Sequence, residues 1–205
     1  MTTGPLGHSR DDVDESVVAQ VVGQIPAIGR ITDRALRDAV ALTWACSWRE
    51  SGYTGLDEVL QGQGPITLLH HVNGVDEQAT ALTEQAETTY GLAVDHDVVL
   101  AAAVLHDVDK PLLWTSSGAS VTFRPGRTLA DHGILGAELA ALCGVPERVR
   151  AIVRGHSPYS DRMEDRRSPE AALVYHADNV VAALDALSVG LTPACGLTKL
   201  VPAPC

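Results

Sequence analysis

The amino-acid sequence predicts an all-α protein, a helical bundle with a small loop or β-hairpin inserted around residues 112–127. Ala, Leu and Val dominate the apolar residues, whereas aromatic residues make up 4% of the chain. This composition is typical of helices packed on helices. Apolar residues also recur every three or four positions over long stretches, as on one face of a helix. Gly and Pro punctuate those stretches and indicate where the helices begin and end.

Residues 1–64 are expected to form a helical extension that packs on the rest of the chain. A short helix is predicted over 13–22 and a longer one over 33–50, with Thr32 as a plausible N-cap of the second. Apolar residues repeat every four positions along the longer helix, at Leu36, Val40, Trp44 and Trp48. Such a repeat marks the helical face that packs against a core.

Residues 67–90 are predicted to form a long helix that ends at a glycine. His71 lies beside the apolar face of this helix, three residues after Leu68 and four before Val75. His70 shares its side of the helix with polar residues instead. Helical geometry therefore favours His71 over His70 as the inward-facing histidine.

An apolar helix predicted over 97–107 ends in the adjacent pair His106 and Asp107, and Pro111 prevents it from continuing far. A carboxylate is almost never buried without a compensating positive group. A buried Asp107 beside a histidine therefore indicates a bound metal ion. The insertion at 112–127 follows directly. It is either a wall or lid facing the substrate or a segment that packs its aromatic residues on the core.

Three further helices are predicted, over 129–142, over 146–154 and from the strong start signal Ser168-Pro169 onward. Asp178 falls among apolar neighbours in the last of these helices. A second carboxylate directed toward the core again requires a compensating cation.

The histidines and aspartates of interest recur at helix-sized intervals. Counted with the His106-Asp107 pair as one, the gaps are 35, 25, 24 and 22 residues. A helix with its connection occupies roughly 20–25 residues, so each candidate should come from a different helix or helix end. These candidates fall in a predicted core domain at 65–190, followed by a C-terminal tail at 191–205. They are His71, His106, Asp107, His132, His156 and Asp178.

The ordered set and its local contexts resemble the HD-domain superfamily of metal-dependent phosphohydrolases. The resemblance spans roughly residues 66–187. The matching motifs are Leu68-Leu69-His70-His71, Leu105-His106-Asp107, His132-Gly133-Ile134-Leu135-Gly136-Ala137-Glu138 and Ala177-Asp178-Asn179-Val180. The additional pair His132 and His156 resembles the branches that hold two metals. Those branches include phosphodiesterases, phosphatases and a smaller group of mixed-valent diiron oxygenases.

This resemblance implies a cofactor of two divalent or iron ions, Fe, Mn or similar, which suit histidine and carboxylate ligands. In the arrangement we expect, Asp107 bridges the ions, with His71, His106 and Asp178 around one and His132 and His156 around the other. A metal-bridged hydroxide would then cleave a small phosphate ester or nucleotide. The alternative is a mixed-valent diiron oxygenase acting on a small anionic organic substrate. A regulatory domain with a structural or lost metal is a third reading, disfavoured by the intact ligand set.

Asp107 and Lys110 are the expected catalytic residues, and Lys110 and Arg154 are expected to bind the substrate. Lys110 follows Asp107 by one helical turn, and the resemblance assigns it to an anionic substrate oxygen. Capping of the helix C-terminus is an equal alternative for Lys110, and solvated helix surface is one for Arg154. Asp109 stands where many relatives carry glycine. His176 is expected to be a non-ligating neighbour of Asp178.

The formal net charge of −11 argues against nucleic acid polymers and anionic membranes as partners. The polar first fifteen residues do not resemble a signal peptide, and no apolar run reaches transmembrane length. We therefore expect a cytoplasmic enzyme that acts on a small anionic molecule. The sequence does not fix the oligomeric state, and a homodimer is one of the alternatives. Cys46 and Cys143 are expected to be buried, and Cys195 and Cys205 lack metal-finger spacing.

Overall fold

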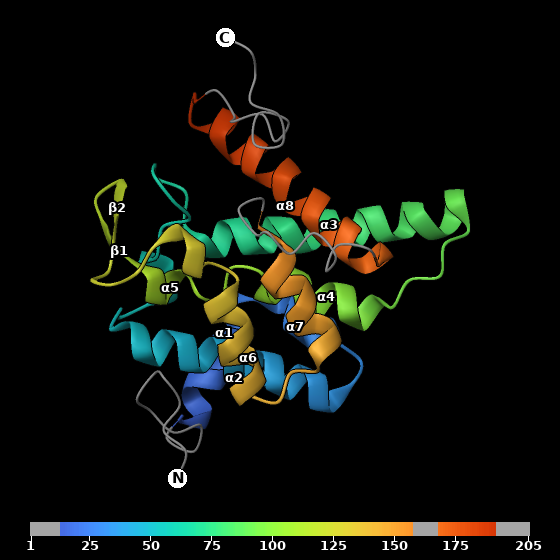
Figure 1. Cartoon of the computed structure of the whole chain (residues 1–205), viewed down its shortest axis with the longest axis horizontal. Helices are drawn as coiled ribbons and strands as arrows, with labels where there is room; N and C mark the ends of the chain where they lie inside the picture. Colours follow the sequence, from blue (N-terminus) through green and yellow to red (C-terminus); the bar gives the residue numbers. More distant parts are fainter. Residues whose placement is uncertain (1–12, 158–167, 192–205) are drawn as a thin grey trace.

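The computed structural model describes residues 13–157 and 168–191, and it shows a helical bundle with one β-hairpin at its side (Figure 1). Its α-helices are α1 (Glu15–Gln24), α2 (Arg34–Ser51), α3 (Leu68–Tyr90), α4 (His96–Leu105), α5 (Lys110–Leu113), α6 (Ile134–Leu142), α7 (Glu147–Gly155) and α8 (Pro169–Ser188). Shorter 3-10 helices are η2 (Pro26–Arg30), η3 (Leu56–Glu58) and η4 (Leu129–Asp131), and the hairpin strands are β1 (Trp114–Ser117) and β2 (Ser120–Phe123). The predicted fold class, a helical bundle with a small insertion, is confirmed.

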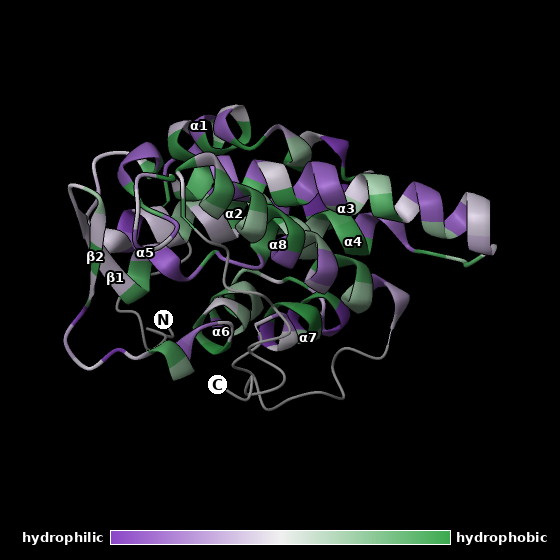
Figure 2. Ribbon diagram, turned by 90° about the horizontal axis from the view of Figure 1, so that it is seen from above, coloured by the Kyte–Doolittle hydropathy of each residue, from purple (hydrophilic) through white to green (hydrophobic). Residues whose placement is uncertain are grey.

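The centre of the bundle is α4, whose residues from Ala101 to Leu105 are completely buried. Helices α3 and α8 pack against each other and against α4, and α2 and α7 also contact α4. Figure 2 shows hydrophobic residues gathered where these helices meet, while the projecting end of α3 is mostly hydrophilic or neutral. Val21 and Trp44 belong to the same apolar cluster as Val104. The described part of the predicted N-terminal extension therefore shares one core with the later helices.

Two side chains of α2 bind main-chain carbonyl groups at and just beyond the C-terminal end of α4. The indole Nε1 of Trp44 donates to the carbonyl oxygen of Val104 at 3.0 Å, and the hydroxyl of Ser47 donates to that of Val108 at 2.5 Å. The last carbonyls of a helix lack partners within the helix. These bonds from α2 therefore satisfy buried acceptors and fix the turn that carries His106 and Asp107.

The chain continues in helical structure beyond Pro111, where the sequence predicts that the helix ends. After a turn it forms the short helix α5, in which Pro111 occupies the first turn. Proline is tolerated there because the amide hydrogen of that position has no helical partner. Leu112 and Leu113, expected to lie in the irregular insertion, are buried residues of α5.

The sequence predicts either a loop or a β-hairpin within residues 112–127, and the structure contains a β-hairpin. Trp114 pairs with Phe123 in the antiparallel register, and their rings meet edge to face with centroids 5.8 Å apart. The Trp114 indole also donates to the Leu60 carbonyl oxygen at 3.1 Å, and the hydroxyl of Tyr53 accepts from the Ser116 amide at 2.7 Å. The hairpin is thereby attached to the segment between α2 and α3.

Two local expectations from the sequence are wrong. The N-cap of α2 is Asp33, which accepts from the Leu36 amide, while Thr32 binds Asp97 instead. The predicted helix over 129–142 is broken into η4 and α6 at Gly133, which has a φ of +80°. A Cβ at that position would lie 2.9 Å from the Val153 carbonyl oxygen, so the close approach of α7 requires a glycine there.

Residues 1–12 of the predicted N-terminal extension and nearly all of the predicted tail at 191–205 lie outside the described residues. Within the part of the chain that the structure describes, none of the helices combines the length and apolarity needed to cross a lipid bilayer.

Replacing Trp44 with Phe is expected to lower the free energy of unfolding by about 1–3 kcal/mol, because it leaves a buried carbonyl group without its donor. Trp48→Phe is the matched control, since its indole bond to Tyr53 is only partly buried and water can replace it at a cost of about 1 kcal/mol or less. Urea denaturation measures both values. Equal losses in the two variants would contradict the role assigned to Trp44.

Candidate metal centre

All six side chains predicted as ligands meet at the centre of the bundle. They come from five different helices or helix ends, because His106 and Asp107 share one segment. They are His71 in the first turn of α3, His106 and Asp107 just after α4, His132 just before α6, His156 just after α7 and Asp178 within α8. The side chains of His132 and Asp178 are 8% and 15% exposed, and the other four are at most 1% exposed. The cluster is therefore accessible from one side, past these two residues.

The six residues form two groups of three, each compact enough to hold one metal ion. One group is His71, His106 and Asp178, and the other is Asp107, His132 and His156. Within each group the candidate ligand atoms all lie within 4.8 Å of one another. The sequence-based division of the histidines and of Asp178 between two ions is the same as this spatial grouping.

Asp107 lies between the two groups and faces both. Its Oδ2 lies 3.1 Å from Nε2 of His106 and 3.6 Å from Nε2 of His71. Its Oδ1 lies 3.3 Å from Nε2 of His132 and 3.7 Å from Nε2 of His156. One carboxylate oxygen is thus directed to each pair of histidines, which is the arrangement expected of a bridging ligand.

The four histidines present the same nitrogen to the centre because their other nitrogen is engaged elsewhere. Nδ1 of His106 and of His156 each lies 2.6 Å from a main-chain carbonyl oxygen, that of Ala103 and Val153 respectively. Nδ1 of His71 lies 2.8 Å from Asp185 Oδ2, and Nδ1 of His132 lies 2.9 Å from Asp109 Oδ1. All four partners are acceptors, so each Nδ1 carries a proton, and a ring in its neutral form directs an Nε2 lone pair inward.

This arrangement fits metal ions better than it fits hydrogen bonding within the protein. The Nε2 atoms of His132 and His156 lie 3.2 Å apart, so two neutral rings would point lone pairs at each other. Nε2 of His106 is buried and has no hydrogen-bond partner among the described residues. Divalent cations would satisfy these nitrogens, and the mixed nitrogen and carboxylate donor set suits ions such as Fe or Mn.

The carboxylates of the cluster are held in their charged form. Burial by itself would raise the pKa of Asp107, but the adjacent His106 and Lys110 hold it well below its usual range. Burial likewise opposes ionisation of Asp178, but the hydrogen bond with His71 and the electrostatic attraction of His106 and His71 together outweigh it and lower the pKa of Asp178. Both carboxylates are therefore ionised at neutral pH and attract cations.

Lys110 lies against both the bridging carboxylate and the wall of a small cavity. Its Nζ is 2.6 Å from Asp107 Oδ2 and 5.5 Å from the centre of the Trp114 ring. The cavity measures about 150 Å³ and opens onto the cluster. Its lining residues are Gln61, Asp107, Lys110, Trp114, Leu129, His132, His156, Ser157, Asp178, Asn179 and Ala182.

Other residues singled out in the sequence lie elsewhere. Arg154 pairs with Glu147 at 2.5 Å and is not among the described lining residues of the cavity, so its substrate role stays a prediction. The His70 side chain is 68% exposed, as helical geometry predicted. His176 is also exposed and its ring meets that of Tyr175 edge to face, so the expectation that it neighbours Asp178 is wrong.

Sequence analysis missed two carboxylates that contact ligand histidines, Asp109 and Asp185. In the sequence Asp109 stands out only as a departure from glycine, and nothing local reveals its contact with His132. Asp185 follows Asp178 by two helical turns and therefore lies on the same face of α8. That spacing was a signal that could have identified Asp185 in advance.

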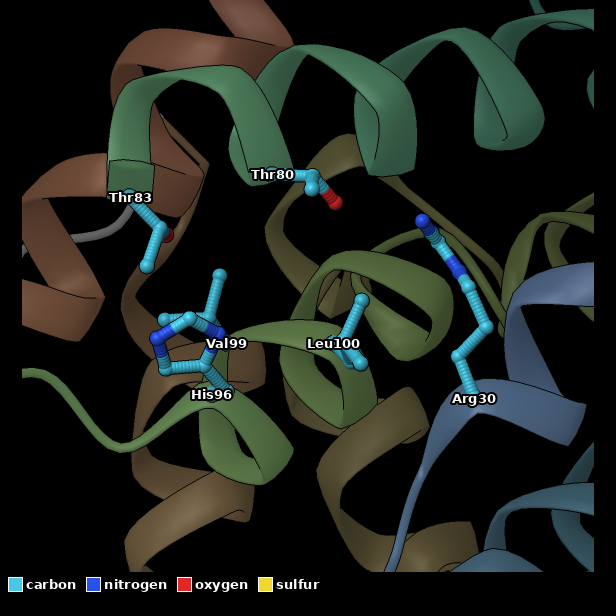
Figure 3. A pocket seen from close by; sticks show the side chains of 6 residues that line it. All are labelled: Arg30, Thr80, Thr83, His96, Val99 and Leu100. Atoms are coloured by element: carbon cyan, nitrogen blue, oxygen red, sulfur yellow. The ribbon is translucent and has the colours of Figure 1, made fainter. Parts of the chain in front are cut away.

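A second hollow, of about 200 Å³, lies between η2, α3 and α4, away from the cluster (Figure 3). Its lining residues are Arg30, Thr80, Thr83, His96, Val99 and Leu100. Arg30 pairs with Asp76, His96 pairs with Glu87, and the threonine hydroxyls donate to carbonyl groups of their own helix. Its polar groups are thus engaged within the protein, and no candidate metal group among the described residues lies there.

The bundle and the two His/Asp groups define the class of protein, a helical protein with a central cluster of side chains that could hold metal. The HD domain family model matches residues 68–183, more than half of the 205-residue chain, so this protein belongs to the HD domain family. This family indicates the superfamily of metal-dependent phosphohydrolases. The match begins with α3, ends in α8 and includes all six residues of the cluster. Comparison with curated proteins and with solved structures gave no match.

The metal-free protein is expected to lose stability as the pH rises from 6 to 9. Burial opposes protonation of His71, but Asp178 and Asp185 outweigh it and raise the pKa of His71 to about 9, from 6.5 in the unfolded chain. Since the folded pKa is the higher one, protonation of His71 stabilises the fold fully below pH 6.5 and ceases to do so as the pH passes 9. Urea denaturation of chelator-treated protein should show a loss on the order of 2–3 kcal/mol.

The control for this pH dependence is His71→Gln, which removes the titrating ring. Its unfolding free energy should vary much less between pH 6 and 9. A wild-type profile as flat as that of the variant would contradict the raised pKa.

Proposed function

We propose that this protein is a phosphohydrolase that holds two divalent ions and cleaves a small phosphate ester or nucleotide. The observation that carries the proposal is the position of Asp107, whose two oxygens face different pairs of histidine nitrogens. Membership of the HD domain family supports the hydrolytic class. The low pKa of the buried carboxylates supports the retention of cations at neutral pH.

The chain's own residues would divide the two ions between them. His71, His106 and Asp178 would hold one, His132 and His156 the other, and Asp107 both. Each histidine has its Nδ1 fixed by an acceptor, so little rearrangement is needed before Nε2 can ligate. When bound, the ions would supply electrostatic stabilisation of phosphoryl oxygens and acidify a water molecule for attack on phosphorus.

Lys110 is the residue we assign to the substrate's anionic group. Its ammonium lies 2.6 Å from Asp107 Oδ2, so it serves as a countercharge to that buried carboxylate. Cations on Asp107 would take over this role and leave the ammonium available to a phosphate oxygen in the cavity. The position of Lys110 in the cavity wall, above Trp114, keeps it within the space that a substrate would occupy.

The remaining cavity wall offers contacts to the organic part of a substrate. Trp114, Leu129 and Ala182 provide apolar surface that excludes water from the reacting group. Gln61 contributes an amide oxygen that is buried without a hydrogen-bond partner among the described residues. A hydroxyl or amino group of the substrate would satisfy that oxygen.

The first test is the metal content of tag-free protein, followed by activity assays of the same preparation. Two ions per chain and phosphate release from a panel of phosphate esters and nucleotides are the expected results. Two irons per chain with substrate-dependent oxygen consumption, and no phosphate release, would replace this proposal by the oxygenase alternative. Failure to bind any divalent metal after reconstitution would contradict both.

Asp107→Ala is expected to abolish retention of both ions and activity together, because it removes the carboxylate whose two oxygens face both pairs of histidines. Lys110→Met keeps the stem over Trp114 but removes the ammonium group. We expect it to keep two ions while kcat/KM falls about 10- to 100-fold, the value of one charge-assisted hydrogen bond. Elemental analysis and steady-state kinetics measure both. Retention of two ions by Asp107→Ala would contradict the bridging role of Asp107.

A further inference from the structure

We propose that Asp109 is a positioning residue that fixes the tautomer of His132 and thereby supports one of the two metal positions selectively. The inference deepens the proposed function and rests on it, because it concerns how this chain prepares a ligand for the metal. Asp109 is not itself in either group of candidate ligands. It acts through His132.

Asp109 is completely buried and binds three donors with its two oxygens. Oδ2 accepts from the main-chain amides of Gly133 at 2.7 Å and Gly136 at 3.1 Å. Oδ1 lies 2.9 Å from Nδ1 of His132. The two amides belong to the start of α6, where amide groups lack helical partners, so they hold the carboxylate in one orientation.

That orientation decides the proton position on the ring. An ionised carboxylate can only accept, so Nδ1 of His132 must donate and Nε2 keeps its lone pair toward the metal position. Burial lowers the pKa of the His132 ring. The charge and the hydrogen bond of Asp109 more than offset that effect, so the pKa is raised. Geometry alone, however, sets which nitrogen carries the proton of the neutral ring.

An asparagine at this position would move the ring proton of His132 from Nδ1 to Nε2. Its oxygen would have to face Gly133 and Gly136, because turning the amide group over would place NH₂ against two main-chain donors. The NH₂ group would then face His132, whose Nδ1 must become an acceptor. The ring proton would move to Nε2 and block the metal-facing lone pair.

Asp185 provides a matched control, because it contacts His71 in the other group of candidate ligands. Its Oδ2 lies 2.8 Å from Nδ1 of His71, and its Oδ1 lies 3.5 Å from Nε2 of the exposed His70. No main-chain amide among the described residues binds Asp185. An asparagine there can present its oxygen to His71 and its NH₂ group to His70, so the inward-facing nitrogen of His71 is preserved.

The test compares wild-type protein, Asp109→Asn and Asp185→Asn. On chelator-treated, ¹⁵N-histidine-labelled protein, long-range ¹H–¹⁵N spectra report which nitrogen of each ring is protonated. We expect His132 to be protonated on Nδ1 in the wild type and in Asp185→Asn, and on Nε2 in Asp109→Asn. Mn²⁺ titration by calorimetry should then show one of two sites weakened about 10- to 100-fold in Asp109→Asn, with both sites retained in Asp185→Asn.

The two readouts separate failure of this inference from failure of the proposed function. An unchanged His132 tautomer in Asp109→Asn, or wild-type affinity at both sites, would overturn the role of Asp109. Absence of Mn²⁺ binding by the wild type would overturn the metal proposal, while the spectra would still test Asp109. If Asp109→Asn does not fold, Asp109→Gly removes the acceptor without adding a donor, and undiminished affinity in that folded variant would overturn the inference.

Discussion

The structure is organised around an ionised carboxylate, that of Asp107, which the fold removes almost completely from water. Desolvation of a charge carries a penalty that only several well-placed partners can offset. Lys110 and four histidine nitrogens surround the two Asp107 oxygens at 2.6–3.7 Å. Those partners come from α3, α5 and the ends of α4, α6 and α7, so five segments of the bundle must pack together to keep this one group charged.

The histidines differ in how their outer nitrogen is satisfied, and the difference follows from helix polarity. His106 and His156 follow the C-terminal ends of α4 and α7, where carbonyl groups are free, and each binds the carbonyl three residues earlier. His71 and His132 lie at N-terminal ends of helices, where the free main-chain groups are amide donors. An Nδ1–H group finds no acceptor there, so a carboxylate from another segment has to supply one. This explains why α3 and α6, and not α4 and α7, require Asp185 and Asp109.

Local patterns in the sequence predicted the helices and the ligand set because both depend on periodicity. His71 was separated from His70 by its place on the apolar face, and burial confirmed the choice. His176 lies about 200° around the helix from Asp178, so closeness in sequence does not place it in the environment of Asp178. The break at Gly133 and its bond with Asp109 depend on the approach of α7, a tertiary contact that no local pattern contains.

The segment before the family match completes the cavity rather than the ligand set. Gln61 lines the cavity, the Leu60 carbonyl group fixes the Trp114 indole, and Tyr53 binds strand β1. The candidate ligands all lie within residues 68–183. Because the proposed hydrolase and its oxygenase alternative would use the same ligands, the donor set alone does not select a substrate. Selection must come from the walls around it, and in this chain one of those walls is built by residues that precede the HD domain.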